Sequence, residues 1–377
     1  MEKLFADIPW REIIFAAFCF VIFVQLFYYA FFFSRLAFFK SQSKEKSQQH
    51  PVSVIICAKD EAGKLAANLP GSLVQTYPTT HEVIVVNHTS QDDTRFLLDE
   101  LKKTFKGLHI VNLQHDAIGI PGKKYPLSVG IKEAKYEIVL LTDADCVPAS
   151  EFWIEKMQEA YHDGIEVVLG YGAYHKKPGL LNKLIRFETF HAALQYLSYA
   201  IAGMPYMGVG RNLSYKKELF FKNKGFSSIN HLPGGDDDLF INMVANKKNT
   251  AIVVDPETFT LSEAKKTFSG WITQKLRHYS ASKYYKFKHK FLLGLYSFTH
   301  FLLYPLLALS IIFFNWKLSL IAFGIRFIVQ AFIYFKTMKK LNEKDLLAWW
   351  WLFDIWMFFY YLIFVPALWK KPRPTWN

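Results

Sequence analysis

Two aspartates separated by one residue, Asp143 and Asp145, follow directly after the apolar run 138–141. In a strand, residues two apart point to the same side, so both carboxylates can face one cation where the strand ends. Carboxylate oxygens suit Mg²⁺ or Mn²⁺, and such an ion can hold a diphosphate. An Asp-x-Asp pair is also common in turns that end a strand, so its interpretation depends on the residues around it.

The segment around this pair alternates short apolar runs with helical patterns. We expect strands at 52–57, 82–86, 109–113 and 137–141, and helices at 61–73, 94–105 and 125–134. That alternation predicts an α/β fold with a parallel, doubly wound sheet, which binds ligands outside the carboxyl ends of its strands. The polar residues at those ends are Asp60, Glu61, Asn87, His88, Asp143 and Asp145. The sequence contains neither the Gly-x-Gly-x-x-Gly pattern nor a phosphate loop, which disfavours a dinucleotide enzyme or a kinase.

Apolar residues are concentrated at the two ends of the 377-residue chain, of which 51% is hydrophobic. Runs at 13–39, 292–314, 318–335 and 346–368 are long enough to span a bilayer. The first run is long for a cleavable signal peptide and lacks a small-residue cleavage site, which favours an uncleaved anchor. We therefore expect a membrane anchor at 1–40, a basic linker at 41–50, an α/β domain at 51–290 and a C-terminal membrane region at 291–377.

The net charge of +13 is compatible with nucleic-acid binding, but many of the lysines flank the apolar runs. Basic residues there follow the positive-inside rule and fit an anionic membrane surface, so we expect no nucleic-acid partner. The basic linker places the α/β domain in the cytoplasm, and three widely spaced cysteines fit a reducing compartment. Three spans after that domain would put the C-terminus outside, whereas Lys370, Lys371 and Arg373 favour the inside.

Two charged residues, Arg326 and Asp354, lie inside predicted spans that a short loop joins. Each is costly in hydrocarbon unless it is paired, and we predict that they pair with each other. Residues 180–201 have a helical pattern rich in aromatics, which is typical of a core helix or of a helix at the membrane interface. Residues 207–215 look extended, and Gly210 permits close approach of the backbone to a ligand.

Several motifs, in the same order, resemble those of the family-2 glycosyltransferases, which are inverting enzymes of the GT-A fold that use nucleotide-sugar donors. The resemblance covers about residues 51–282. The matching segments are 52–62, 75–78, 86–94, 122–131, Asp143-Ala-Asp145, 235–239 and 274–278. One such motif would be weak, but from the ordered set the chain is identified as a member of this family.

The resemblance implies a role for each matching residue. Asp145 would bind Mg²⁺ or Mn²⁺, Asp236 would be the general base, and Arg277 would donate hydrogen bonds to the leaving diphosphate. The Asp triplet around Asp236 can also be a solvated turn or a helix cap, and Lys123 can be an exposed loop lysine. The donor would be bound by Cys57, Ala58, Asp60, Glu61, His88, Lys123, Asp143 and Gln274, and the acceptor side would include Gly210, Asn212, Trp271 and His278.

Three positions depart from the family pattern. His88 stands where the family has the carboxylate that accepts the uracil N3–H. A neutral imidazole can still accept one hydrogen bond, so a UDP-sugar stays the favoured donor. Gly235 replaces the acidic residue before the base. His278 replaces a tryptophan that supports acceptor stacking in processive polymer synthases, which weakens that interpretation.

From the resemblance and the membrane segments together, we expect an inverting glycosyltransferase of the bacterial inner membrane with a cytoplasmic catalytic domain. It would move a hexose or N-acetylhexosamine from a nucleotide sugar to a lipid or lipid-linked glycan, in the synthesis of cell-envelope polysaccharide. The alternatives are a processive surface-polysaccharide synthase, a transferase to polyprenyl phosphate and a non-catalytic membrane scaffold.

Overall fold

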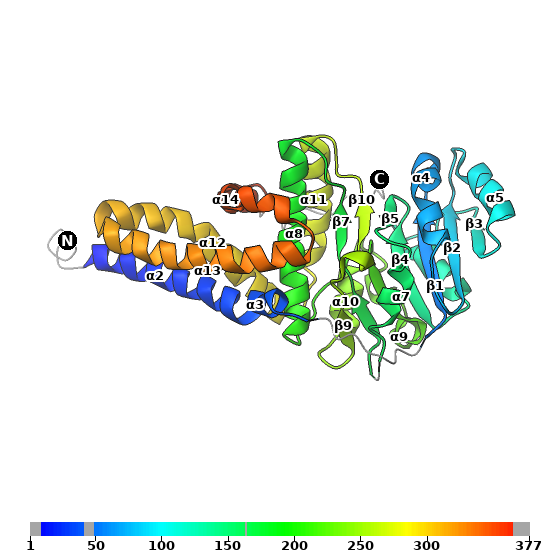
Figure 1. Ribbon diagram of the computed structural model, residues 1–377, viewed down its shortest axis with the longest axis horizontal. Helices are drawn as coiled ribbons and strands as arrows, with labels where there is room; N and C mark the ends of the chain where they lie inside the picture. Colours follow the sequence, from blue (N-terminus) through cyan, green and yellow to red (C-terminus); the bar gives the residue numbers. More distant parts are fainter. Residues whose placement is uncertain (1–8, 41–48, 163, 365–377) are drawn as a thin grey trace.

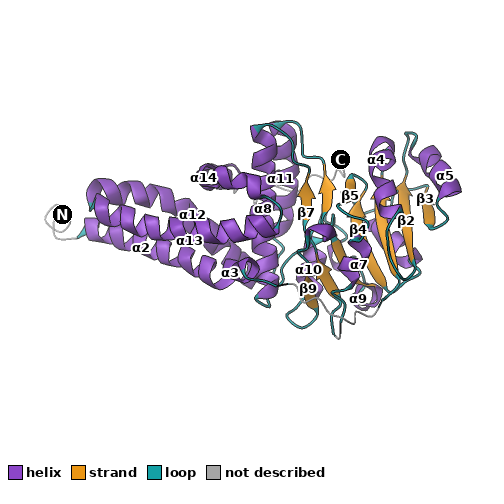
Figure 2. Ribbon diagram, viewed as in Figure 1, coloured by secondary structure: helices purple, strands orange, loops and turns teal. Residues whose placement is uncertain are grey.

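The computed structural model describes residues 9–40, 49–162 and 164–364. These residues form an α/β domain and a long bundle of apolar helices (Figures 1 and 2). Helices α8 (Leu180–Ile201) and α11 (Phe268–Ser282) stand across the end of the bundle, between it and the sheets. The α/β domain therefore meets the bundle through two helices of its own.

The main sheet has seven strands in the order β3-β2-β1-β4-β8-β6-β9. The four predicted strands are confirmed within two residues, and they pair in parallel. The sheet is mixed rather than parallel throughout, because β8 pairs antiparallel with both β4 and β6. The strands are β1 (Val52–Ala58), β2 (His81–His88), β3 (Leu108–Leu113), β4 (Ile138–Asp143), β6 (Val167–Leu169), β8 (Leu213–Lys216) and β9 (Thr250–Ile252).

Helices cover both faces of this sheet. Successive side chains of a strand point to opposite faces, so alternate residues of one strand pack against different helices. Ile55 and Cys57 of β1 belong to the core cluster that includes α6, whereas Val54 and Ile56 belong to the cluster that includes α4, α5 and α7. The doubly wound arrangement is therefore confirmed. The helices of this domain besides α8 and α11 are α4 (Ala62–Leu73), α5 (Thr94–Thr104), α6 (Lys124–Glu133), α7 (Trp153–Gln158), α9 (Lys217–Lys222) and α10 (Asp238–Val244).

A smaller sheet of three strands, in the order β5-β10-β7, lies beside the main one. Its strands are β5 (Cys146–Pro148), β7 (Gly172–Tyr174) and β10 (Thr260–Ser262). Strand β5 begins directly after Asp145 and pairs antiparallel with β10. This pairing fixes the direction in which the chain leaves the Asp-x-Asp turn.

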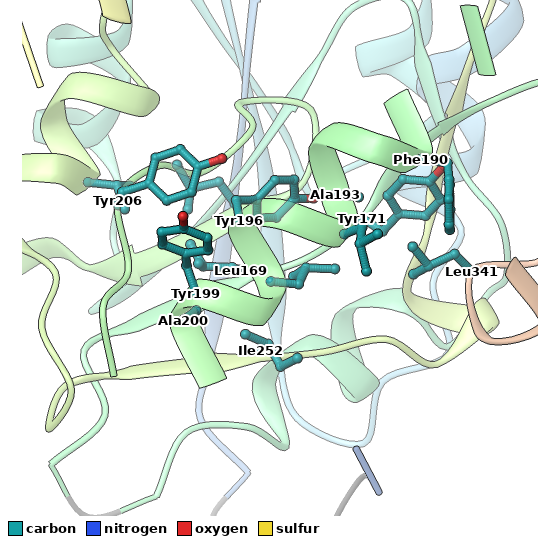
Figure 3. Close-up of a cluster of buried hydrophobic side chains, with 14 of the residues drawn as sticks. Leu169, Tyr171, Phe190, Ala193, Tyr196, Tyr199, Ala200, Tyr206, Ile252 and Leu341 are labelled. Carbon is teal, nitrogen blue, oxygen red and sulfur yellow. The ribbon is translucent and has the colours of Figure 1, made fainter. Parts of the chain in front are cut away.

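Helix α8 is buried on nearly all of its sides. Figure 3 shows its residue Tyr196 among the buried side chains that include Leu169 of β6, and the Tyr196 hydroxyl donates to the carbonyl of Gly170 at 2.8 Å. Toward the bundle, the ring of Phe190 lies 5.4 Å from that of Tyr334. Both interpretations of 180–201 are therefore partly right, since α8 belongs to the domain core and also borders the apolar helices.

Among the described residues, three helices are long and apolar enough to cross a membrane, at Trp10–Ala37, Phe287–Phe313 and Trp316–Lys340. They cover the first three predicted spans. The first consists of α2 (Trp10–Phe27), a π-helical turn η1 (Tyr28–Phe33) and α3 (Ser34–Ala37), and the others are α12 (Phe287–Phe313) and α13 (Trp316–Lys340).

The fourth predicted span, 346–368, is described only in part. Its described part is the short 3₁₀ helix η4 (Lys344–Ala348) followed by α14 (Trp350–Phe364). The described part of α14 has 15 residues, fewer than each of the three helices above. Residues 365–368 and the three basic residues near the C-terminus, Lys370, Lys371 and Arg373, lie outside the described residues.

The predicted ion pair in the membrane region is confirmed. Arg326 Nη1 lies 2.7 Å from Asp354 Oδ2, and both side chains are buried. Asp354 also accepts hydrogen bonds from the Tyr304 hydroxyl at 2.7 Å and from Gln330 Nε2 at 2.7 Å. A buried carboxylate with this set of donors is compensated in charge and in hydrogen bonding.

Candidate active site

The ends of three neighbouring strands meet at one edge of the main sheet. In the strand register Cys57 is level with Asp143 of β4 and with Val86 of β2, and Ala58 is level with Asn87. Cys57 and Ala58 are buried, so they form the floor of the site. Burial, together with the charges of Asp236 and Asp143, raises the pKa of Cys57 to about 12 despite the opposing charge of Lys123. Its thiol therefore stays neutral.

Lys123 forms an ion pair with Asp143 at this edge. Burial alone would favour the neutral amine, but the carboxylates of Asp143 and Asp236 hold the pKa of Lys123 above its usual value. Burial likewise favours a protonated Asp143, but Lys123, and then Arg211 and Arg277, hold its pKa below the usual range. Lys123 is thus a largely buried, ion-paired residue of this edge rather than an exposed loop lysine.

A metal ion would find its oxygen ligands at the Asp-x-Asp turn. One ligand atom each from Asp143, Asp145 and Cys146 lies within 4.8 Å of the others. Burial and the charges of the two aspartates raise the pKa of Cys146 well above that of an ordinary thiol, so it is a poor ligand for a hard cation. Because Asp143 is already paired with Lys123, Asp145 is the carboxylate best placed to bind Mg²⁺ or Mn²⁺ directly.

Arg211, which the sequence analysis did not single out, is a second cation at this turn. Its Nη1 donates to Ser262 Oγ at 2.8 Å and to the carbonyl of Ala173 at 3.3 Å, and its guanidinium lies 4.4 Å from the Tyr174 ring. The charge on Arg211 favours ionised Asp143. A cation between Gly210 and Asn212 in an otherwise uncharged stretch was the only signal for it in the sequence.

We expect Asp145→Ala to abolish the metal-dependent release of nucleoside diphosphate that the family resemblance implies, because the predicted metal ligand is lost. A metal ion contributes several kcal/mol of charge stabilisation, so the rate should fall by about 100-fold or more. The measurement is diphosphate release by purified protein with and without Mn²⁺, alongside Mn²⁺ binding followed by electron paramagnetic resonance. Asp99→Ala, at an exposed aspartate of α5, is the control and should change neither result.

The Asp triplet is divided between two roles. Asp237 caps α10, since its side chain accepts from the backbone N–H groups of Gly210 at 2.8 Å and of Asp238 at 2.7 Å. Burial and the charges of Asp236 and Asp238 raise the pKa of Asp237 to about 8. The helix-cap interpretation therefore holds for Asp237. Asp236 is half-buried and interacts electrostatically with Lys123 and Cys57, which places it at the strand ends.

The segment that begins with Gly122 supports the loop before Asp236. Gly122 has a φ of +80°, and a Cβ there would lie 2.3 Å from the carbonyl oxygen of Pro233. Lys124, two residues after Gly122, is fully buried and donates to the carbonyl of Leu232. Glycine is needed at 122 both for its backbone conformation and for this close approach.

Asp60 and Glu61 join the loop after β1 to the loop after β2. Asp60 Oδ1 accepts from the backbone N–H of Gln91 at 2.6 Å, and the backbone N–H of Glu61 donates to Thr94 Oγ1 at 3.1 Å. The Glu61 side chain pairs with Lys64 at 2.6 Å. These contacts shape the rim where the family resemblance places the nucleoside.

His88 has a carboxylate beside it. His88 Nε2 lies 2.7 Å from Asp116 Oδ1, and Lys59 Nζ lies 4.0 Å from the same oxygen. Burial and the charge of Lys59 lower the pKa of His88, although Asp116 opposes this change, so the imidazole is largely neutral. Asp116 lies in the loop after β3, where no pattern in the sequence marked it.

Helix α11 carries the last motif. Gln274 is half-buried, whereas Arg277 and His278 are exposed, and the charge of Arg277 reaches Asp143. Arg277 is therefore on the same side of the domain as the donor end of the site. Trp271 is fully buried instead, with its ring centroid 5.7 Å from that of Phe364 in α14.

Two of the four predicted acceptor-side residues, Trp271 and Asn212, thus lie in the interior. Asn212 Nδ2 donates to the carbonyls of Tyr171 at 3.0 Å and Thr258 at 2.7 Å, and its Oδ1 accepts from Trp153 Nε1 at 3.1 Å. Asn212 therefore makes its hydrogen bonds inside the protein, and Trp271 packs against α14, so neither side chain is exposed toward an acceptor in this structure.

The family model described as "Glycosyltransferase like family 2" matches residues 50–281. Poly-β-1,6-N-acetyl-D-glucosamine synthase of Staphylococcus epidermidis is 30% identical over 159 residues, which are 41% of this chain and 36% of that protein. Glycosyltransferase AglE of Haloferax volcanii is 26% identical over 194 residues, which are 49% of this chain and 58% of that protein. The chain thus spans roughly a third to three-fifths of the length of these relatives.

A solved structure, the mannosyltransferase PcManGT from Pyrobaculum calidifontis in complex with GDP-Man and Mn²⁺, has the same fold. Its TM-score is 0.58 at 17% sequence identity, and the match covers 92% of this chain and 99% of that chain. Such a likeness supports the fold alone. Because the family model matches more than half of the sequence, the chain belongs to glycosyltransferase family 2, and its α/β domain is a GT-A glycosyltransferase domain.

Proposed function

We propose that this glycosyltransferase moves a sugar from a UDP-sugar, with inversion, to a lipid or lipid-linked glycan at the cytoplasmic face of the bacterial inner membrane. The acceptor class rests on how the site is joined to the apolar helices. Helix α11 carries Arg277 and His278 on its exposed side, and its other side packs on α14. A donor site built directly against apolar helices favours an acceptor that arrives along the membrane surface.

The contacts between α11 and its neighbours are extensive. The Tyr279 ring stacks on that of Phe364 at 5.7 Å, and Lys275 forms a buried ion pair with Glu188 of α8. The Tyr360 hydroxyl donates to the same glutamate at 3.4 Å. These contacts hold the phosphate-facing helix rigidly relative to α14, which favours an acceptor bound where the two parts meet.

In the proposed reaction, the acceptor hydroxyl attacks the anomeric carbon as the nucleoside diphosphate leaves from the opposite face. Asp236 accepts the hydroxyl proton, and Arg277 donates hydrogen bonds to the departing phosphate oxygens. A divalent ion on Asp145 would, when bound, neutralise part of the diphosphate charge. Lys123 keeps Asp143 ionised and oriented toward the donor.

The test of the acceptor class is a direct comparison of acceptors. Purified protein in lipid nanodiscs should transfer sugar to membrane-extracted lipid acceptors at least about ten times faster than to soluble sugars, because a membrane raises the local acceptor concentration. Equal turnover of soluble and lipid-linked acceptors would contradict the proposal.

The proposed uracil specificity follows from the contact between His88 and Asp116. A neutral His88 can donate its Nε2–H to Asp116, which orients a carboxylate at the nucleoside rim. Uracil offers an N3–H donor to such a carboxylate, whereas cytosine has an acceptor at that position. Asp116 would thus supply, from the next loop, the acceptor that the family has at position 88.

We expect Asp116→Asn to weaken UDP binding by about 10-fold, because a hydrogen bond to a charged acceptor is worth about 1.5–3 kcal/mol. CDP binding should change little, so the preference for UDP over CDP should fall by the same factor. Isothermal titration with UDP and CDP measures both. Asp99→Asn, at an exposed aspartate of α5 outside this rim, is the matched control. An unchanged UDP/CDP ratio in Asp116→Asn would remove this residue from base recognition.

One relative favours a second candidate function. The Staphylococcus epidermidis protein, at 30% identity over 159 residues, is named as a polysaccharide synthase, which would make this enzyme processive. Product length separates the two candidates. A single sugar added per acceptor supports the proposal above, whereas a polymer that grows without release supports the second.

A further inference from the structure

Helix α10 is tied to the start of α12 by a set of buried hydrogen bonds that no part of the mechanism above uses. α10 (Asp238–Val244) begins two residues after Asp236, and α12 (Phe287–Phe313) is one of the helices able to cross a membrane. The segment between α11 and α12 reaches back to α10 at two points. These are Asp238 and Asn242, one turn apart on the same helix.

The first point joins Asp238 to Tyr285. The Tyr285 hydroxyl donates to Asp238 Oδ2 at 2.7 Å, and the exposed fractions of the two residues are only 7% and 8%. The other oxygen of Asp238 accepts from the backbone N–H of Leu239 at 2.7 Å. Each carboxylate oxygen of Asp238 therefore has a hydrogen-bond donor inside the protein. A tyrosine hydroxyl bonded to a buried carboxylate is a strong contact, because charge-assisted hydrogen bonds exceed neutral ones.

The second point is Asn242, whose side-chain amide bonds in three directions. Its Oδ1 accepts from the backbone N–H of Lys286, the N-cap residue of α12, at 3.0 Å. Its Nδ2 contacts the carbonyl of Tyr206 at 2.7 Å and His289 Nδ1 at 3.0 Å. Asn242 is 2% exposed, so these contacts replace water completely. The asparagine thereby holds the first turn of α12.

Aromatic rings fill the space around these two points. The ring of Tyr206 lies 5.8 Å from that of Tyr285, 6.1 Å from that of His289 and 5.3 Å from that of Tyr199 in α8. Figure 3 shows Tyr199 and Tyr206 facing each other at the end of the buried cluster. The bonds between α10 and α12 are therefore made inside a rigid, dry environment, where they restrict movement most.

We infer that Tyr285 and Asn242 are positioning residues that fix the loop carrying Asp236 relative to the first C-terminal membrane helix. The inference rests on the proposed role of Asp236 as the base. Asp236 lies directly N-terminal to the α10 cap, so a shift of α10 moves its carboxylate relative to the donor. Because α12 holds α10 in place, the position of this membrane helix determines where the Asp236 carboxylate lies when it accepts the proton. An error of about 1 Å in such geometry can lower a rate by about 10²-fold.

The test replaces only the Tyr285 hydroxyl. Tyr285→Phe should lower kcat by about 10-fold while leaving the donor KM and the binding of the nucleoside diphosphate within twofold, because the hydroxyl touches neither. Tyr284→Phe is the matched control, since this neighbouring tyrosine is 46% exposed, and its kcat should not change. The double variant Tyr285→Phe/Asp238→Ala should be no slower than Asp238→Ala alone, because both changes remove the same bond.

Hydrogen exchange of residues 236–244 tests the contact without any need for activity. Faster exchange there in Tyr285→Phe than in Tyr284→Phe supports the inference, and equal exchange overturns it. A fall in kcat matched by Tyr284→Phe, or additive losses in the double variant, would also overturn it. If the wild-type protein transferred no sugar, the proposed function would fail, and the exchange result would still decide whether Tyr285 holds α10.

Discussion

Asp236→Asn is expected to lower kcat for sugar transfer by about 10²–10⁴-fold, which is the contribution of a positioned general base. The amide keeps the size of the side chain but cannot accept the acceptor proton. Donor binding should stay within a few-fold, because Lys123, Arg277 and the metal ligands are unchanged. The measurement is single-turnover transfer at saturating donor, with binding of the diphosphate measured separately.

The same variant separates two acceptor chemistries. A polyprenyl phosphate is already ionised and needs no base, so with such an acceptor Asp236→Asn should be nearly harmless. Asp237→Asn is the matched comparison, because this carboxyl has a pKa of about 8 and serves as the cap of α10. We expect it to cost less than about 10-fold in kcat. If Asp237→Asn were the more damaging of the two, the assignment of the base would be wrong.

Asp354→Ala is expected to destabilise the membrane region by about 3–5 kcal/mol, the usual cost of leaving a buried charge without its partner. Arg326 is fully buried, and its Nη1 bonds to Asp354. The opposite change, Arg326→Ala, should cost less, because Asp354 keeps the hydrogen bonds from Tyr304 and Gln330. The measurement is thermal unfolding in lipid nanodiscs, followed by the fluorescence of the intrinsic tryptophans.

Two further variants give this prediction its controls. Replacing both residues by leucine removes both charges together and should be less harmful than either single change, as is found for buried ion pairs in general. Exchanging them, with Asp at 326 and Arg at 354, should restore part of the lost stability. If both single alanine variants were as stable as the wild-type protein, the ion pair would contribute nothing to stability.

Much of the fold followed from local patterns. The run of Ile138 to Leu141 is buried on both faces, as such a short apolar run predicts for a central strand. The short strands could not be predicted, because they carry no local pattern. β5, β6, β7, β9 and β10 have three residues each, too few for any periodicity, and they form only because a neighbouring strand offers hydrogen bonds.

Candidate site residues that belong to one sequence motif could be predicted, whereas those that the fold brings together from different segments could not. Asp143 and Asp145 were found because two residues after a buried strand carry the whole signal. Arg211 and Asp116 contact residues of other segments. Such contacts are made by the fold, so no recognisable residue spacing marks them in the sequence. The burial of Trp271 was not predictable, because the motif that it adjoins says nothing about α14, which covers its ring.

The hydrogen bonds of the buried Gln25 side chain in α2 can form only late in the synthesis of this protein. Its Nε2 bonds to the Tyr296 carbonyl at 3.2 Å and to Thr299 Oγ1 at 2.9 Å, and the first of these partners is 271 residues further along the chain. At about 5–20 residues per second, a ribosome needs about 14–54 s to reach it. During that interval the first helix, which is long and apolar enough to cross a membrane, carries a polar amide with no partner from α12. Newly made chains should therefore be most vulnerable to membrane quality control just before α12 emerges.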